Sequence, residues 1–233
     1  MNEPAEELTD GPLARDRKLE HIRLALRAET QTEHRFFDDY RLEHNPLPEM
    51  ALEEVDLSAE FLGRRLEAPL LISCMTGGTE AAGRINRNLA IAAEECGVAL
   101  GVGSQRKVIE GGTGPETFQL RRFAPSIPLL ANLGAVQLNY GFGEVECRAA
   151  VEMAGADALV LHLNVLQEAI QPEGQTDFRG LLRKMGEVAR ALDVPVIAKE
   201  VGCGIPARVG RALLEEGIRI VDTAGLGGTS WAR

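Results

Sequence analysis

The sequence predicts an α/β protein, and within that class the first six strands of a TIM (β/α)8 barrel with an N-terminal helical extension. Three observations support this prediction. Short apolar runs recur at intervals of a few tens of residues, as fully buried parallel strands do. Helical segments separate these runs, which is the pattern of βαβ units. Polar residues and glycines follow every run, whereas a doubly wound sheet would concentrate them at one or two crossings.

Each expected strand is an apolar run that ends in a polar or glycine-rich turn. A helix through Ile85, Leu89 and Ala93 is expected after the first strand, because these residues recur at helical spacing. A complete barrel has eight strands, so either the sheet is open or this chain is part of a barrel, and we favour the second alternative. The fourth strand begins at Ala158, and the others are expected over residues 69–75, 98–103, 128–133, 194–200 and 219–224.

The region before the first strand is expected to contain a disordered segment and a short helix. Residues 1–15 are acidic, contain proline and glycine, and have no apolar period, which is typical of disorder. Leu19, Ile22 and Leu26 then recur at helical spacing and predict a short helix that carries Arg17 and Lys18 near its start. Residues 16–233 are expected to form a single domain.

Composition and charge limit the classes of function. With 45% hydrophobic and 26% charged residues, the chain is typical of soluble globular proteins, and no apolar run approaches the ~18 residues of a membrane span. A formal net charge of −10 argues against non-specific binding to nucleic acid or acidic membranes, although nearby cations can still bind a small anion. Four separated cysteines and the absence of a signal peptide favour free thiols in the cytoplasm and argue against a zinc site.

Glycines and cations gather at the expected carboxyl ends of the strands. The glycine-rich segments 75–78 and 225–230 could let the backbone approach a flat ring or a phosphate closely, although such segments are often only turns. Arg106 follows the second run, and Lys199 lies at the end of the fifth. Lys199 ends an apolar strand, where an unpaired ammonium is costly, so either Glu200 or another acid neutralises it, or a cofactor does.

The fourth strand is followed by neutral polar side chains and one carboxylate. His162 and Asn164 are two residues apart in an expected strand and so should share a face, with Gln167 and Glu168 in the turn beyond. An ordinary polar loop after a strand would give the same pattern. If the cluster is functional, its single carboxylate suits a hard cation such as Mg²⁺, which keeps several bound waters and is also coordinated by substrate phosphate.

Seven segments in order carry a more specific signal. They are Arg17-Lys18-x-x-His21, His44-Asn45-Pro46-Leu47-Pro48-Glu49, Met75-Thr76-Gly77-Gly78, Gly103-Ser104-Gln105-Arg106, His162-Leu163-Asn164-x-x-Gln167-Glu168, Lys199-Glu200-Val201-Gly202-x-Gly204 and Val221-Asp222-x-Ala224-Gly225-x-Gly227-Gly228-Thr229-Ser230-Trp231. In these segments the chain resembles type 2 isopentenyl-diphosphate isomerase, the FMN-dependent kind. Each segment alone is modest, but seven in the same order are highly specific.

The resemblance implies an FMN-binding barrel. Lys199 would lie near the pyrimidine edge of the flavin, where a cation stabilises the anionic reduced ring. The family normally has serine at the position of Ala224, and its last two strands, which carry further contacts to the FMN phosphate, are absent from this chain. The residues implied to contact FMN are Met75, Thr76, Gly77, Ser104, Asn132, Lys199, Ala224 and Thr229.

The resemblance also implies conversion of isopentenyl diphosphate to dimethylallyl diphosphate in isoprenoid biosynthesis, without net redox change. FMN would be reduced by NADPH, Gln167 and His162 would be the catalytic residues, and Glu168 would bind Mg²⁺. The expected protein is a cytoplasmic homo-oligomer, a tetramer or octamer. The residues implied to bind the diphosphate substrate are Arg17, Lys18, Ser104, Gln105, Arg106, His162, Asn164 and Gln167.

Two alternatives remain open at this stage. One is another FMN barrel, such as a 2-hydroxy-acid oxidase or dehydrogenase, whose histidine base and arginine lie late in the barrel. Net oxidation of a hydroxy acid would favour it. The other is a non-catalytic fragment that holds a subunit interface and no cofactor, which a colourless protein would favour.

Overall fold

The computed structural model describes residues 36–225. The segment expected to be disordered at 1–15, the helix that carries Arg17 and Lys18, and Thr229 in the last glycine-rich segment lie outside the described residues. Within the described range, no helix combines the length and the apolar character needed to cross a membrane.

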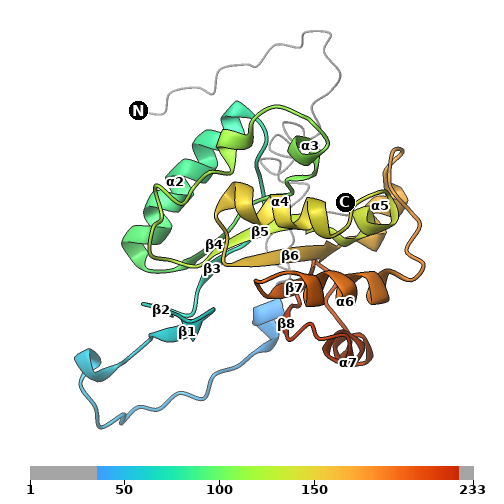
Figure 1. Ribbon diagram of the computed structural model, residues 1–233. Coiled ribbons are helices and arrows are strands. Elements are labelled where there is room, and N and C mark those ends of the chain that lie inside the picture. Colours follow the sequence, from blue (N-terminus) through green and yellow to red (C-terminus); the bar gives the residue numbers. More distant parts are fainter. Residues whose placement is uncertain (1–35, 226–233) are drawn as a thin grey trace.

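Six parallel strands form one sheet in which every strand lies beside the next one in the chain (Figure 1). This sequential order is that of a barrel, because a doubly wound sheet reverses its strand order at a switch point. The predicted fold class is confirmed, and each strand lies within its expected segment except β5, which extends one residue further, to Gly134. The strands are β3 (Leu71–Ile72), β4 (Ala99–Gly101), β5 (Leu129–Gly134), β6 (Ala158–Leu163), β7 (Val196–Glu200) and β8 (Ile220–Asp222).

Helices follow the strands and cover the outer face of the sheet (Figure 1). The α-helices are α2 (Glu80–Cys96), α3 (Arg106–Ile109), α4 (Glu144–Ala154), α5 (Val165–Ile170), α6 (Leu181–Ala191) and α7 (Ala207–Glu215). Short 3₁₀ helices are η2 (Phe36–Asp39), η3 (Leu52–Glu54), η4 (Pro115–Thr117) and η5 (Ala135–Asn139).

Helix α2 confirms the helix expected after the first strand, with a somewhat different inner face. The Thr79 hydroxyl accepts the Ala82 N–H at 3.1 Å and caps its start, and Gly97 ends it in the left-handed conformation. Its buried residues include Ala90 and Ala93, whereas Ile85 is 37% exposed. Small side chains let this helix lie close to the sheet.

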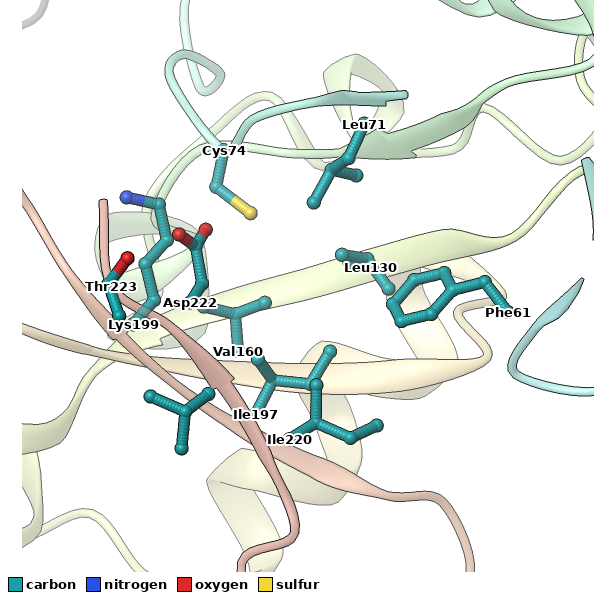
Figure 2. Close-up of a pocket in the computed structure, with 11 residues that line it drawn as sticks. Phe61, Leu71, Cys74, Leu130, Val160, Ile197, Lys199, Ile220, Asp222 and Thr223 are labelled. Atoms are coloured by element: carbon teal, nitrogen blue, oxygen red, sulfur yellow. The ribbon is translucent and has the colours of Figure 1, made fainter. Parts of the chain in front are cut away.

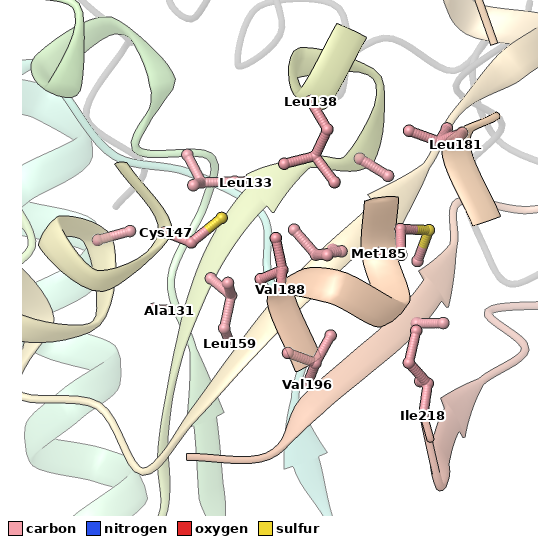
Figure 3. Packing of buried hydrophobic residues seen from close by; sticks show 14 of the residues in the cluster. Ala131, Leu133, Leu138, Cys147, Leu159, Leu181, Met185, Val188, Val196 and Ile218 are labelled. Carbon is pink, nitrogen blue, oxygen red and sulfur yellow. The ribbon is translucent and has the colours of Figure 1, made fainter. Parts of the chain in front are cut away.

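The larger core lies between the sheet and its outer helices (Figure 3). Alternate residues of a strand point to opposite faces, so Leu133 of β5 and Leu159 of β6 pack outward. There they contact a layer that includes Cys147 of α4 and Met185 and Val188 of α6. The remaining strand residues point to the concave inner face, where the candidate site lies.

An antiparallel hairpin precedes the sheet and was not expected from the sequence. Its strands are β1 (Ala59–Phe61) and β2 (Arg64–Leu66), joined by Leu62 and Gly63. Both linking residues have positive φ, 52° and 70°, as a tight two-residue hairpin turn requires. Phe61 thereby reaches the concave face of the sheet (Figure 2).

Candidate active site

A row of polar positions crosses the carboxyl end of the sheet. The register pairs Gly134 of β5 with His162 of β6, His162 with Lys199 of β7, and Lys199 with Asp222 of β8. Paired residues in a parallel sheet share a face, so these four positions line the concave side together. Two residues earlier on each strand, the register forms an apolar row that contains Val160, Ile197 and Ile220.

A pocket of about 300 Å³ opens on this concave side (Figure 2). Phe61 and Leu130 lie at its apolar end, and Lys199, Asp222 and Thr223 lie at its polar end. A pocket with apolar walls and a few polar groups at one end is the usual form of a cofactor or ligand site.

Lys199 contributes a buried positive charge to this pocket. Only 7% of the residue is exposed, and its Nζ donates a 2.7 Å hydrogen bond to the backbone carbonyl of Glu200. The Glu200 carboxylate does not neutralise it, because one of its oxygens accepts backbone N–H groups of Gly202, Cys203 and Gly204 at 2.6, 2.5 and 3.2 Å. No carboxylate within residues 36–225 lies within 4.0 Å of the ammonium. A buried ammonium without a counter-ion favours binding of an anion.

His162 is held as a neutral ring by its neighbours. Its Nδ1 lies 3.0 Å from the side-chain oxygen of Asn132, whose amide also hydrogen-bonds the Cys74 thiol. That oxygen can only accept, so Nδ1 carries the hydrogen and Nε2 presents a lone pair. Burial, and next the positive charge of Lys199, lower the pKa of His162 to about 4, although Glu168 opposes the shift. Burial raises the pKa of the Cys74 thiol to about 12, so both groups are uncharged near pH 7.

Gln167 and Glu168 lie in helix α5, not in the expected turn. The Glu168 N–H donates to the Asn164 carbonyl at 2.9 Å, which forms a helical turn directly after the strand. Asn164 therefore leaves the strand geometry that it was expected to share with His162. Helical spacing brings residues 164, 167 and 168 to one face, and the Asn164 amide nitrogen donates to Gln167 at 3.1 Å and to Glu168 at 2.9 Å.

The Glu168 carboxylate is buried and fixed at both oxygens. Oε1 accepts from Asn164, and Oε2 accepts the backbone N–H of Gln175 at 2.7 Å. Each oxygen retains a second lone-pair position. Within the described residues no group of three or more histidine, cysteine or acidic side chains forms a metal cluster. A cation here would therefore rest on Glu168 with water and ligand oxygens.

The Gln105 side chain, which was expected to contact the diphosphate, connects structural elements behind the site. The side chain is fully buried, its Nε2 donates to the Ala150 carbonyl at 2.8 Å, and its Oε1 accepts the Asn132 N–H at 3.0 Å. It thus ties α4 to β5 behind the site. Arg106, at the start of α3, pairs with Glu110 at 2.9 Å.

The loops after β3 and β4 lie against each other. The Thr76 carbonyl accepts the Gly103 N–H at 2.8 Å and the Asn86 amide at 3.1 Å. A Cβ on Gly103 would come within 2.5 Å of the Thr76 backbone, and one on Gly77 would overlap the Phe118 ring. Glycine at these positions allows the close approach.

Known relatives identify the family, although no protein-family model matches the chain. An isopentenyl-diphosphate delta-isomerase from a Nostoc species is 48% identical over 235 residues, which cover 100% of this chain and 67% of that protein. This chain belongs to the isopentenyl-diphosphate delta-isomerase family. A Synechococcus protein of the same name is 54% identical over 219 residues, and the match covers 93% of this chain. The chain spans 63% of the length of that relative.

Solved structures with a similar fold are distant in sequence. A mandelate oxidase variant with an FMN adduct has a TM-score of 0.50 at 16% identity, covering 76% of this chain and 54% of that one. A lactate oxidase from Pediococcus acidilactici has a TM-score of 0.50 at 14% identity, covering 74% and 52%. At these identities the likeness concerns the fold alone.

In this member of the isopentenyl-diphosphate delta-isomerase family, the site also contains residues that were not predicted from the sequence. Cys74 contacts Asn132, Asp222 pairs in register with Lys199, and Gln137 and Gln175 support the Glu168 region. Asp222 could have been found from its place at the end of an apolar run. The two glutamines carry no such signal, because they lie in connecting segments 38 residues apart.

Proposed function

We propose that the protein isomerises isopentenyl diphosphate to dimethylallyl diphosphate as a type 2 enzyme, with reduced FMN, NADPH as the reductant, and Mg²⁺. The observation that carries this proposal is the extended match to relatives named isopentenyl-diphosphate delta-isomerase, at 48% and 54% identity in the two described above. The geometry of the concave face adds support for the FMN-dependent form.

The residues present fit an anionic planar cofactor. The ammonium of Lys199 is buried and lacks a counter-ion among the described residues, and it lies at the polar end of the pocket. The Gly103 N–H donates to the Thr76 carbonyl, so the loops after β3 and β4, together called the cradle here, lie in close contact at the carboxyl ends of these strands. Lys199, Asn132 and the residues of this cradle would hold the FMN. When bound, reduced FMN would supply the proton chemistry at the reacting carbons.

The Glu168 region fits a hard cation. Its carboxylate is aimed by two hydrogen bonds and keeps lone pairs available, and the side-chain oxygen of Asn164 is buried without a partner among the described residues. Oxygen acceptors of this kind suit Mg²⁺, which keeps several waters and binds substrate phosphate. Glu168 would then bind the cation that neutralises the diphosphate.

The protein side chains provide position and electrostatics. A double-bond shift adds a proton at one carbon and removes one at another, and a neutral His162 with a pKa of about 4 is a weak acid source near pH 7. Its Nδ1–H is engaged by Asn132. His162, Asn164 and Gln167 would therefore orient the substrate in a fixed, mostly uncharged site.

The deciding experiment supplies the purified protein with FMN and Mg²⁺ under anaerobic conditions, reduces the flavin with NADPH, and adds isopentenyl diphosphate in deuterated water. We expect dimethylallyl diphosphate that carries deuterium, with no oxidised product. Oxidation of mandelate or lactate without isomerisation would favour the 2-hydroxy-acid oxidase alternative. A protein that binds no flavin and isomerises nothing would contradict both enzyme functions.

A further inference from the structure

The loop between α5 and α6, residues 171–180, is held by the segment that follows β5. Asn139 donates from its amide to the carbonyls of Asp177 and Arg179 at 2.8 and 3.1 Å. The Tyr140 hydroxyl accepts the N–H groups of Thr176 and Asp177, both at 3.1 Å. Phe178 packs against the core, and these hydrogen bonds fix the polar residues on either side of it.

Gln137 also contacts this loop, through Gln175, the residue that hydrogen-bonds Glu168. Only 3% of Gln137 is exposed, and its Nε2 donates to the side-chain oxygen of Gln175 at 2.9 Å. The backbone N–H of the same Gln175 donates to the Glu168 carboxylate at 2.7 Å. A continuous path of two hydrogen bonds therefore joins Gln137 to the orientation of Glu168.

The other end of the Gln137 amide faces His162. Its Oε1 is buried and has no hydrogen-bond partner among the described residues. A Cβ on Gly134 would overlap this oxygen and would come within 3.0 Å of His162 Nε2. Gln137 Oε1 and His162 Nε2 thus adjoin the same small space above Gly134. One amide spans the distance between the His162 side of the site and the loop that supports Glu168.

We propose that Gln137 is a positioning residue for Glu168, and that it acts through the side chain and backbone of Gln175. The inference rests on the proposed function, in which Glu168 binds the cation. Loss of the Gln137 contact should free the loop at Gln175, weaken the N–H bond to the carboxylate, and let the carboxylate rotate. Partners that orient a metal ligand typically change metal affinity about 10–100-fold when they are removed.

The test compares Gln137→Leu with Gln119→Leu, the same change at an exposed residue away from the site. We expect the Mg²⁺ concentration for half-maximal isomerisation to rise at least about 10-fold in Gln137→Leu, with kcat restored by excess Mg²⁺. Hydrogen exchange of the Gln175 amide should accelerate in the same variant. Gln119→Leu should change neither quantity. A general loss of folded protein would lower kcat at every Mg²⁺ concentration, so this dependence separates positioning from stability.

A second variant keeps the proposal falsifiable if Gln137→Leu does not fold. Gln175→Leu breaks the same side-chain contact from the less buried side, and the double variant should be no worse than either single one, because both remove one contact. Unchanged Mg²⁺ dependence together with unchanged Gln175 exchange in a folded variant would overturn the proposal. Exchange needs neither substrate nor cofactor, so it decides the positioning contact even if the wild-type protein fails to isomerise and the proposed function falls.

Discussion

Lys199 and His162 are paired neighbours on β7 and β6; the lysine is buried, which is unusual for an ammonium, and the histidine is half-buried. Among the described residues, the ammonium has only the Glu200 backbone carbonyl as a hydrogen-bond partner, while the imidazole is kept neutral beside it. The polar end of the pocket therefore holds one ammonium, one carboxylate (Asp222) and a neutral, hydrogen-bonded ring. The Lys199 ammonium can attract an anion at short range although the whole chain has a net charge of −10.

The titration of His162 tests this arrangement at the level of one residue. Its pKa of about 4, lowered first by burial and then by Lys199, should be visible in an NMR titration of the imidazole nitrogens. We expect Lys199→Met to raise this pKa, because a nearby positive charge is removed. Lys184→Met, which removes a lysine bound to the Leu138 carbonyl in the outer layer, should leave it unchanged. Ordinary titration of His162 near pH 6.5 in the wild-type protein would contradict the account.

The same shift has a consequence for stability. Since the folded-state pKa of His162 lies below its unfolded value, the unfolded chain binds more protons between about pH 6.5 and pH 4. His162 therefore destabilises the fold progressively as the pH falls through this window, and it has no such effect above it.

The loops after β3 and β4 lie in close contact, and a substitution at Gly103 tests how much this contact contributes to stability. A Cβ at this position would meet backbone atoms of Thr76, which cannot move aside as a flexible side chain would. We expect Gly103→Ala to cost about 1–3 kcal/mol in the free energy of unfolding, measured by urea denaturation.

The matched control for this prediction is Gly210→Ala in the interior of α7. Apart from its own helix backbone and chain neighbours, no atom of the described residues lies within 4 Å of a Cβ built there, and alanine favours a helix more than glycine does. This variant should be more stable by about 0.5–1 kcal/mol. If both alanine variants changed stability in the same direction, the close packing of the two loops would not be the cause.

The elements that the sequence predicts well are those with a strong local signal. Apolar runs indicated the strands, and His162 and Lys199 stood out as polar residues near the ends of two of these runs. Helix α5 was expected to be a turn because its six residues are too few to show a helical period. The hairpin was missed because it needs a positive φ at Leu62, and leucine gives no sign of such a conformation. The position of Gln137 could not be predicted because it depends on a contact with a loop that is distant in the sequence.

At the scale of the whole molecule, the end of the sheet opposite the site has a different role. Asp157 precedes β6, and its carboxylate accepts from Arg64 at 2.8 Å, from Arg121 at 2.7 Å and from the Leu129 N–H at 2.8 Å. This cluster ties the hairpin, the β5 start and the β6 start together. Residues at the amino end of barrel strands generally serve stability.

We expect Asp157→Ala to lower the free energy of unfolding by about 3 kcal/mol, because it leaves two part-buried guanidinium groups without their shared carboxylate. Thermal denaturation measures the loss, and FMN binding to the folded fraction should be retained. Asp193→Ala, which removes a carboxylate that is itself 91% exposed, should change stability by less than about 0.5 kcal/mol. Equal losses in the two variants would show that the Asp157 cluster has no special role.

This contribution should also depend on pH. Burial opposes ionisation of Asp157, but the Leu129 N–H and the guanidinium groups of Arg121 and Arg64 together hold its pKa below the usual value. The stabilisation is therefore present above about pH 4 and is lost as the pH falls through the lowered pKa.

The most direct test of the account is the flavin midpoint potential in the wild-type protein and in Lys199→Met, with Lys184→Met as the control. If the buried ammonium faces the cofactor, its removal destabilises the anionic reduced flavin. A loss of about 1.4 kcal/mol lowers the two-electron potential by about 30 mV, and we predict a decrease of at least that size in Lys199→Met only. An unchanged potential and unchanged FMN affinity in Lys199→Met would contradict the central claim that Lys199 faces the cofactor.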